Sequence, residues 1–445
     1  MITISSLANF LSMDAKEIEN IDSITNENGN FITLTLKKKD CFCPNCSSSH
    51  YEIKDYCIRQ IKHALFLNKT TTFLLKSRRY RCLECGRTFM ENNNLAPKRS
   101  RVSYETIYTV LEAARRYNST WKEIGRIAHV TDETAINIFD RYVNLPRHKL
   151  PKVLSIDECY NKHQFDKAYS CILFDFLGTQ IVDIIEDRSK HKLSYYFSKL
   201  NREERDNVQY VVIDMWEPYL DIAQMYFHNV TVAIDSFHVL KEMGFALDQV
   251  RRKIMSGYRK GSEEYYLLKK WNELLFSDQS PWGEKMKIKG LRNGWYNKYQ
   301  IQQKILDIHP NLRTAQEFYI LYKRQNQITN IEGAEAMIDS FINNKEIVKI
   351  DEFIPIIKTL INWKPYIINS FIIVDGRRLS NGPIEGFNSN FKKMMVVGNG
   401  LYSFLRFRNR LMYCYNKPNC ISPVKNKIQK KPRGKRGPYK KAGNQ

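Results

Sequence analysis

The chain has 445 residues, more than one ordinary hydrophobic core supports, so we expect two to four domains. Its formal net charge is +23, and 12% of its residues are aromatic. A positive field of this size attracts polyanions, and aromatic side chains stack on bases. Nucleic acid is therefore the expected partner. A basic surface without such a partner is the alternative. No apolar run approaches the ~20 residues that span a bilayer, and the first residues do not resemble a signal peptide, so we expect a cytoplasmic protein without membrane contact.

The amino-terminal region carries a concentration of cysteines that points to a metal. A helical pattern at the start is followed by strict alternation over residues 31–36, which predicts a half-buried strand. Two CxxC pairs come next, and their members are Cys43, Cys46, Cys82 and Cys85. Four thiolates around one tetrahedral ion, at ~2.3 Å from each sulfur, are typical of structural zinc. Redox-active pairs are the alternative, but two pairs together favour a shared ion. Residues 51–80 between them are rich in strand formers and predict a hairpin.

Basic residues beside the second cysteine pair are candidates for contact with DNA phosphates, with a solvated face as the alternative. These candidates are Arg78, Arg79 and Arg81. Residues 119–128 and 132–143 then have helical periodicity, with Thr131 as the N-cap of the second helix. The pair predicts a helix-turn-helix that reads the major groove, although an ordinary helical pair remains possible. The exposed face of its second helix would present Asn137 and Arg141 to DNA.

Residues 151–240 alternate strand and helix in an order that places two aspartates together. Strands are expected at residues 153–157, 169–174, 181–185, 210–214 and 230–235, with helices at 192–200 and 219–227. This order is that of a ribonuclease H-like α/β fold, in which the first and fourth strands are neighbours. Asp157 and Asp214 would then emerge side by side at adjacent strand ends. Any strand-end aspartate can instead be a turn former. Asp235 is the main competitor for a role as metal ligand, but we expect Asp235 and His238 to contact the metal ligands and not the metal.

A third carboxylate lies far downstream, at the start of a helix marked by Pro383. Apolar residues at 384, 387, 391 and 394 define one helix face, and Glu385 shares the other face with Asn388 and Lys392. Lys392 is therefore a further candidate for DNA contact. Carboxylate oxygens select hard ions such as Mg²⁺ or Mn²⁺, and two such ions suit phosphodiester chemistry. We therefore expect Asp157, Asp214 and Glu385 to hold two ions.

Four stretches in this order, together with the cysteine pairs, carry a resemblance to a known family. They are Ser155-Ile156-Asp157-Glu158, residues 212–219 (VIDMWEPY), residues 234–239 (IDSFHV) and residues 380–388 (SNGPIEGFN). The chain resembles the ISL-three group of bacterial insertion-sequence transposases. The resemblance implies a DDE transposase with Asp157, Asp214 and Glu385 as its triad and an amino-terminal region that binds the terminal inverted repeats of the element.

The resulting prediction is a multidomain α+β protein that cleaves DNA at the element ends and joins it to target DNA, as a homo-oligomer on the bacterial nucleoid. The alternatives are a DNA-binding regulator with an inert nuclease-like domain and a nuclease or resolvase without strand transfer. The expected parts are a zinc-binding domain (1–100), a helix-turn-helix domain (101–148), the ribonuclease H-like core (149–240 and 379–420), a helical insertion (241–378) and a basic disordered tail (421–445).

Overall fold

The computed structural model describes residues 15–66, 69–161, 165–288, 291, 294–397 and 403–417. The expected basic tail at 421–445 lies outside the described residues. The chain divides into two compact units, residues 1–146 with 393–445, and residues 147–392. In the described residues no helix is long and apolar enough to cross a membrane.

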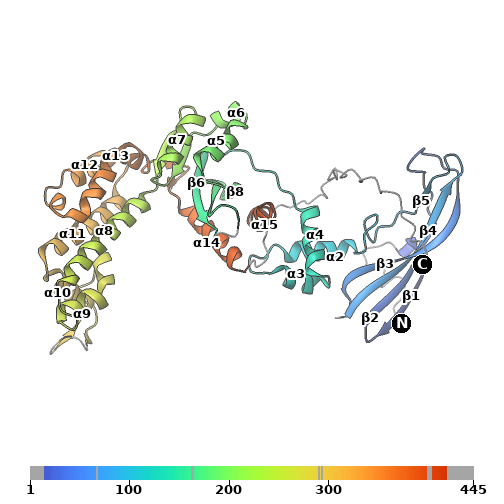
Figure 1. The fold of residues 1–445 in the computed structure, drawn as a ribbon, viewed down its shortest axis with the longest axis horizontal. Helices are drawn as coiled ribbons and strands as arrows, with labels where there is room; N and C mark the ends of the chain where they lie inside the picture. Colours follow the sequence, from blue (N-terminus) through green and yellow to red (C-terminus); the bar gives the residue numbers. More distant parts are fainter. Residues whose placement is uncertain are drawn as a thin grey trace, which may run out of the picture. The chain divides into compact units, whose positions relative to one another are not determined.

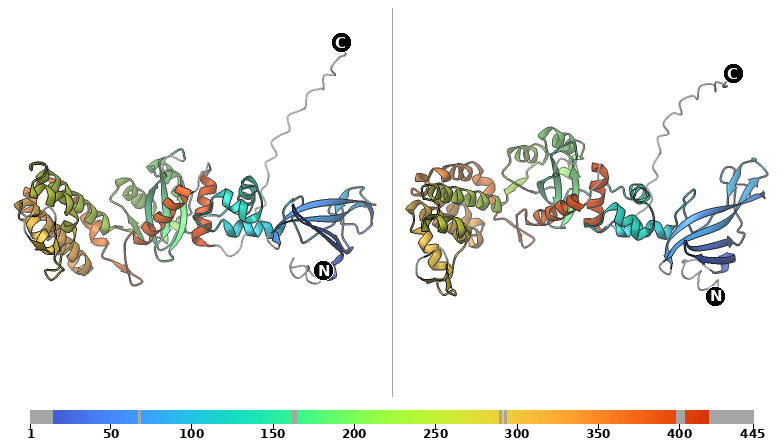
Figure 2. Two further views of the ribbon diagram at one scale, coloured as in Figure 1. Left: turned by 90° about the horizontal axis from the view of Figure 1, so that it is seen from below. Right: turned by 60° about the horizontal axis from the view of Figure 1, so that its bottom comes forward.

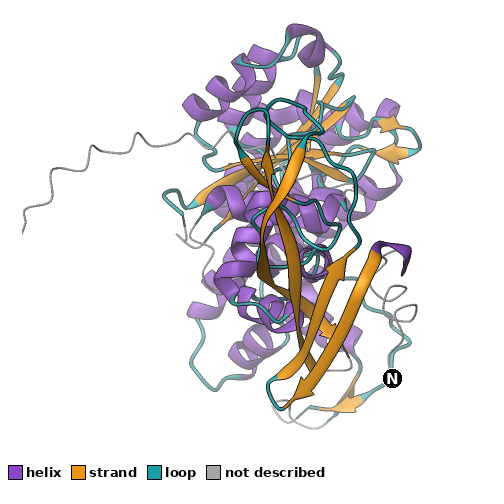
Figure 3. Cartoon of the chain, turned by 90° about the vertical axis from the view of Figure 1, so that its right-hand side faces the viewer, coloured by secondary structure: helices purple, strands orange, loops and turns teal. Residues whose placement is uncertain are grey.

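The first unit begins with a five-stranded sheet, shown in the foreground of Figure 3. A short 3-10 turn (Ala15–Glu17) leads into β1 (Ile18–Asn26), and residues 1–14, where the predicted helical pattern begins, lie outside the described residues. The other strands are β2 (Gly29–Leu36), β3 (Tyr51–Phe66), β4 (Lys69–Cys82) and β5 (Thr88–Met90). Their order is β1-β2-β4-β3, and β5 pairs with β4. The strand predicted at residues 31–36 and the hairpin predicted between the cysteine pairs are confirmed by β2 and by the antiparallel β3–β4 pair.

Four helices complete the first unit. They are α2 (Tyr104–Ala113), α3 (Trp121–Ala128), α4 (Asp132–Tyr142) and α15 (Phe404–Asn416). The two helices expected on either side of Val130-Thr131 are present as α3 and α4, and the Thr131 hydroxyl accepts the backbone N–H of Thr134 at 3.2 Å, as an N-cap does. Gly125 in α3 permits the tight turn between these helices, since a Cβ there would lie 2.7 Å from the carbonyl oxygen of Val130.

The second unit is built on a mixed sheet of the order β10-β9-β6-β7-β8. Its strands are β6 (Val153–Tyr160), β7 (Tyr169–Asp175), β8 (Gln180–Ile185), β9 (Tyr210–Ile213) and β10 (Thr231–Ile234). Only β7 runs antiparallel to its neighbours, and β6 pairs with β9 in parallel. The predicted adjacency of the first and fourth strands is therefore confirmed. The crossover helices are α5 (Lys190–Ser198), α6 (Arg202–Asp206) and α7 (Glu217–Tyr226).

A mainly helical segment follows β10, and Figure 1 shows α8 to α13 gathered into one bundle. Its helices are α8 (Ser236–Ser256), α9 (Glu263–Lys270), α10 (Lys298–Leu306), α11 (Pro310–Ile328), α12 (Ile331–Ile342) and α13 (Ile354–Asn369), with 3-10 turns at Asn272–Phe276, Ile347–Lys349 and Asp351–Phe353. Two short hairpins interrupt it, β11 (Met286–Lys287) with β12 (Trp295–Tyr296) and β13 (Ile373–Val374) with β14 (Arg377–Arg378). Ile213 of the sheet and Met243 and Phe318 of the bundle belong to one continuous core.

The chain then returns to the sheet as α14 (Gly382–Val397), the orange helix that lies against the green strands in Figure 2. Ile384, Phe387 and Phe391 are fully buried on one face of α14, as the sequence periodicity predicts. The ring of Phe387 stacks on that of Phe174 in β7, with centroids 6.2 Å apart. This apolar contact fixes α14 against the sheet and brings the adjoining side of the helix, which carries Asn388, to Asp157 of β6.

Candidate functional site

The four cysteines of the two CxxC pairs come together as predicted. Their sulfurs lie within 4.8 Å of one another, with Sγ of Cys43 3.6 Å from Sγ of Cys85 and Sγ of Cys46 3.5 Å from Sγ of Cys82. The β3–β4 hairpin produces this meeting, because it returns the chain beside its starting point. A backbone N–H from Arg87 lowers the pKa of Cys85 to about 6, which favours the thiolate that zinc binds. The arrangement has the donors and the compactness of a closed structural zinc site.

Asp157 and Asp214 also come together, on the neighbouring strands β6 and β9. Their carboxylates and that of Glu158 offer oxygens within 4.8 Å of one another. Asp214 directly follows β9, as predicted. Asp157 lies inside β6 and not at its end, because pairing with β7 extends β6 to Tyr160 after its pairing with β9 stops at Ser155. Asp157 therefore stands where β6 leaves its parallel neighbour.

The two aspartates share an environment that opposes their ionisation. Burial, followed by the charge of Asp214, raises the pKa of Asp157 to about 8. Burial also raises the pKa of Asp214 to about 6, although His238 and an amide donor from Asn381 act in the opposite direction. Crowded, desolvated carboxylates of this kind are stabilised in their ionised form by a bound cation. Oxygen donors favour Mg²⁺ or Mn²⁺, so the residues present fit such an ion.

Glu385 belongs to a second cluster, with Asp235 and His238, whose ligand atoms also lie within 4.8 Å of one another. His238 connects the two clusters, since its Nε2 lies 3.1 Å from Oδ2 of Asp214 and its Nδ1 lies 3.7 Å from Oδ2 of Asp235. Burial alone would lower the pKa of His238, but its contacts with Asp235 and Asp214 outweigh burial and raise it. The three carboxylates predicted as a triad thus border one acidic region, with Asp235 and His238 between Glu385 and Asp214.

Further side chains fix the walls of this region. Arg188 donates to Glu158 at 2.7 Å, and its guanidinium lies 4.1 Å from the ring centroid of Tyr169 and 4.6 Å from that of Trp216. Because Arg188 neutralises Glu158, Glu158 is a weaker candidate for a metal ligand than Asp157. No motif singled out Arg188, since only the fold brings it from the loop after β8 to Glu158 of β6.

Two asparagines that flank Glu385 contact the aspartates, Asn381 from the residue before α14 and Asn388 from within it. Asn381 donates its amide N–H to Oδ1 of Asp214 at 2.9 Å, and Asn388 donates to Oδ2 of Asp157 at 2.6 Å. Both asparagines are buried. Periodicity placed Asn388 on the face of Glu385 but assigned it no partner, and Asn381 was not predicted. The spacing of 381, 385 and 388 along one helix face was the available signal.

Of the residues predicted to contact DNA, Arg78 is buried. Its side chain is 7% exposed, and it donates to the carbonyl oxygen of Leu36 at 2.6 Å and to Glu91 at 3.1 Å. A buried guanidinium with these acceptors is not accessible to a phosphate. Arg79 is half-exposed and is paired with Asp55, with Nε 2.9 Å from Oδ1. The remaining predicted contacts are exposed, and they are Arg81, Asn137, Arg141 and Lys392.

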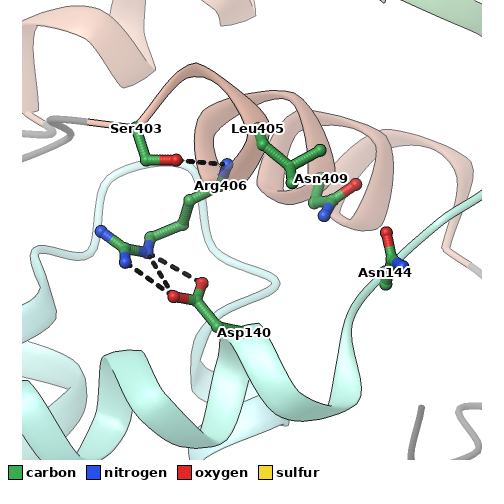
Figure 4. Close-up of a pocket in the computed structure, with 6 residues that line it drawn as sticks. All are labelled: Asp140, Asn144, Ser403, Leu405, Arg406 and Asn409. Atoms are coloured by element: carbon green, nitrogen blue, oxygen red, sulfur yellow. Dashed lines mark hydrogen bonds and ion pairs between the residues drawn. The ribbon is translucent and has the colours of Figure 1, made fainter. Parts of the chain in front are cut away.

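Helix α15 packs with the predicted helix-turn-helix, although the sequence placed residues 379–420 with the catalytic core. Arg406 of α15 pairs with Asp140 of α4 at 2.6 Å, at the edge of a small pocket (Figure 4). Arg410 is fully buried, donates to the carbonyl oxygens of Arg116 and Ser119, and lies 4.6 Å from the ring centroid of Trp121. These contacts make α15 a fourth helix of the α2–α4 group.

Comparisons with known proteins agree with this geometry. A family profile described as "Transposase", that of the ISL3 DDE transposases, matches residues 154–411, which is more than half of the chain. A second profile, described as the zinc-finger of transposase IS204/IS1001/IS1096/IS1165, matches residues 39–85 and contains the four clustered cysteines. A search of curated proteins found no match. The first profile spans the strands that carry Asp157 and Asp214 and the helix that carries Glu385, and the chain belongs to the ISL3 family of transposases.

Proposed function

We propose that this transposase binds the terminal inverted repeats of its own element, cleaves DNA there and joins the freed 3′ end to target DNA. The observation that supports the proposal is the acidic region itself, in which Asp157 and Asp214 from adjacent strands meet the cluster of Glu385. The order β10-β9-β6-β7-β8, with β7 alone antiparallel, further supports a ribonuclease H-like fold for the domain.

Each of the three carboxylates has a distinct part in this proposal. Asp157 and Asp214 come from the rigid sheet and supply paired oxygens, while Glu385 supplies its oxygens from the helix packed against that sheet. Two Mg²⁺ ions held by these residues would activate the attacking oxygen and stabilise the leaving oxygen at the scissile phosphate. His238 and Asp235 form a cluster with Glu385, and His238 also contacts Asp214, so these two residues connect Glu385 to the aspartates. Burial, followed by the charge of Asp235, raises the pKa of Glu385, so this carboxylate also favours a cation nearby.

The first unit is proposed to hold the DNA ends. The zinc-binding sheet and the helices α2 to α4 precede the catalytic domain, and α3 and α4 are joined by only three residues, as in a helix-turn-helix. Asn137 and Arg141 are exposed on α4, the second helix of the pair. Arg81 is exposed close to the zinc cluster, and Lys392 is exposed two turns after Glu385. These four residues are our candidates for contact with bases and phosphates.

The test uses the purified chain, a labelled duplex that carries one element end, and Mg²⁺. We expect nicked and joined products from the wild type and neither product from Asp157→Ala, Asp214→Ala or Glu385→Ala, each with end binding retained. Asp221→Ala is a matched control, because Asp221 is an exposed carboxylate on α7 that pairs with Lys190. Products without joining would indicate a nuclease, and strand transfer retained in any triad variant would remove that residue from the site.

The same assay decides the part played by Asp235. Its carboxylate caps α8 by accepting the backbone N–H of Phe237 at 3.2 Å, and asparagine is an equally good N-cap. Asp235→Asn therefore removes the charge and keeps the cap. We expect a milder loss of cleavage than in Asp214→Asn. Equal loss in the two variants would mean that the second aspartate of the triad is misassigned.

A further inference from the structure

The start of α14 and the residue before it reach the acidic region with three side chains. Asn381, Glu385 and Asn388 follow a spacing of four and then three residues, which places them on one side of a helix. The backbone N–H of Glu385 donates to the carbonyl oxygen of Asn381 at 2.9 Å, so the first of these residues already belongs to the helical turn. Each asparagine contacts one aspartate, and Glu385 lies between them in sequence.

Each of the four carboxylate oxygens of the two aspartates has its own polar partner. In Asp157, Oδ2 accepts from the Asn388 amide at 2.6 Å and Oδ1 accepts from the backbone N–H of Glu158 at 2.7 Å. In Asp214, Oδ1 accepts from the Asn381 amide at 2.9 Å, and Oδ2 lies 3.1 Å from Nε2 of His238. Both oxygens of each carboxylate therefore have a partner, and neither side chain can rotate without breaking a contact.

The orientation of the two amides follows from charge. An amide oxygen at 2.6 Å from a carboxylate oxygen would repel it, whereas an amide N–H at that distance forms a strong charge-assisted bond. The amide oxygens of Asn381 and Asn388 accept no hydrogen bond from the described residues, although both groups are buried. Leaving two buried amide oxygens without a donor costs free energy, and in this orientation both amide N–H groups donate to the aspartates.

We propose that Asn381 and Asn388 are positioning residues, which hold Asp214 and Asp157 in the orientation that binds the metal ions and align Glu385 with them. This inference rests on the proposed metal-dependent cleavage. The apolar side chains of α14 fix the helix to the sheet, and the two amides set its alignment with the aspartates. Groups that orient metal ligands typically contribute 10- to 100-fold in metal affinity or activity.

The experiment measures cleavage of the labelled element end as a function of Mg²⁺ concentration. The variants are Asn381→Leu and Asn388→Leu, which keep approximately the side-chain size and remove the donor. Asn390→Leu is the matched control, because Asn390 is on the same helix but has no role in the site. End binding without Mg²⁺ and the melting temperature are measured on each variant. If a leucine variant does not fold, the alanine variant at that position replaces it.

We expect each site variant to need about 10- to 100-fold more Mg²⁺ for half-maximal cleavage, with saturating Mg²⁺ or Mn²⁺ restoring most of the rate. End binding and melting temperature should match those of Asn390→Leu. An unchanged Mg²⁺ requirement would overturn the inference, as would a loss of rate that no metal concentration restores. If the wild type itself shows no metal-dependent cleavage, the proposed function fails, and this result is distinct from either outcome for the asparagines.

Discussion

Replacing Arg78 with methionine should destabilise the zinc-binding sheet and leave DNA contacts intact. Arg78 and Glu91 form an ion pair whose side chains are only 7% and 8% exposed. Methionine fills much of the same space but leaves the Glu91 carboxylate buried with one remaining donor, the backbone N–H of residue 78 at 2.9 Å. Removing one member of a buried pair typically costs ~3 to 5 kcal/mol. The remaining donor places our expectation near the lower value, about 3 kcal/mol.

This loss can be measured locally, because the zinc cluster belongs to the same sheet and Cys82 is on the same strand as Arg78. A zinc-sensitive dye should report release of the ion on heating at a midpoint lowered by about 6 to 12 °C, from ~2 to 4 °C per kcal/mol for a unit of this size. Arg78→Met combined with Glu91→Gln should recover part of the loss, since no unpaired charge stays buried. Arg81→Met should leave the midpoint unchanged and weaken DNA binding. Weakened binding by Arg78→Met without any loss of stability would refute this reasoning.

The other predictions concern the zinc cluster and α15. Fully reduced protein should contain one zinc per chain by mass spectrometry, and Cys82→Ser should abolish it and weaken end binding, because structural zinc supplies folding free energy; zinc-free wild type that binds DNA normally would contradict this. Arg410→Met should lower the stability of the α2–α4 group by ~1 to 3 kcal/mol, since the buried carbonyl oxygen of Ser119 loses its side-chain donor. Weaker end binding should accompany that loss, with Arg408→Met as the comparison on the same helix.

The sequence predicted the elements that a local residue pattern marks. Alternation predicted β2, the two CxxC pairs predicted the cysteine cluster, and the strand order predicted that β6 and β9 are neighbours. These patterns arise from chain connectivity and from the period of side chains, which are local properties. The meeting of Asp157 with Asp214 could be predicted for the same reason.

Arg78 could not be predicted, because its burial depends on partners remote in sequence. Along β4, the neighbouring strand is β2 as far as Lys76 and β5 from Arg79 onward. Arg78 lies at this exchange, where β2 ends at Leu36, and it satisfies the last carbonyl oxygen of that strand. Nothing in the run of basic residues distinguishes the one arginine at the exchange from its exposed neighbours. Arg410 in α15 was missed for the same reason, since an arginine in an amphipathic helix gives no sign of the surface that it covers.

The position of Glu385 on a helix has a consequence for how the site is assembled. Burial of a large apolar side chain contributes ~1.5 to 3 kcal/mol, so Ile384, Phe387 and Phe391 together contribute about 5 to 9 kcal/mol to the docking of α14. Glu385 itself is exposed and adds little to that docking. The glutamate is therefore held at the acidic region by its neighbours in the helix. We therefore expect Glu385→Ala to abolish cleavage and to leave the fold unchanged.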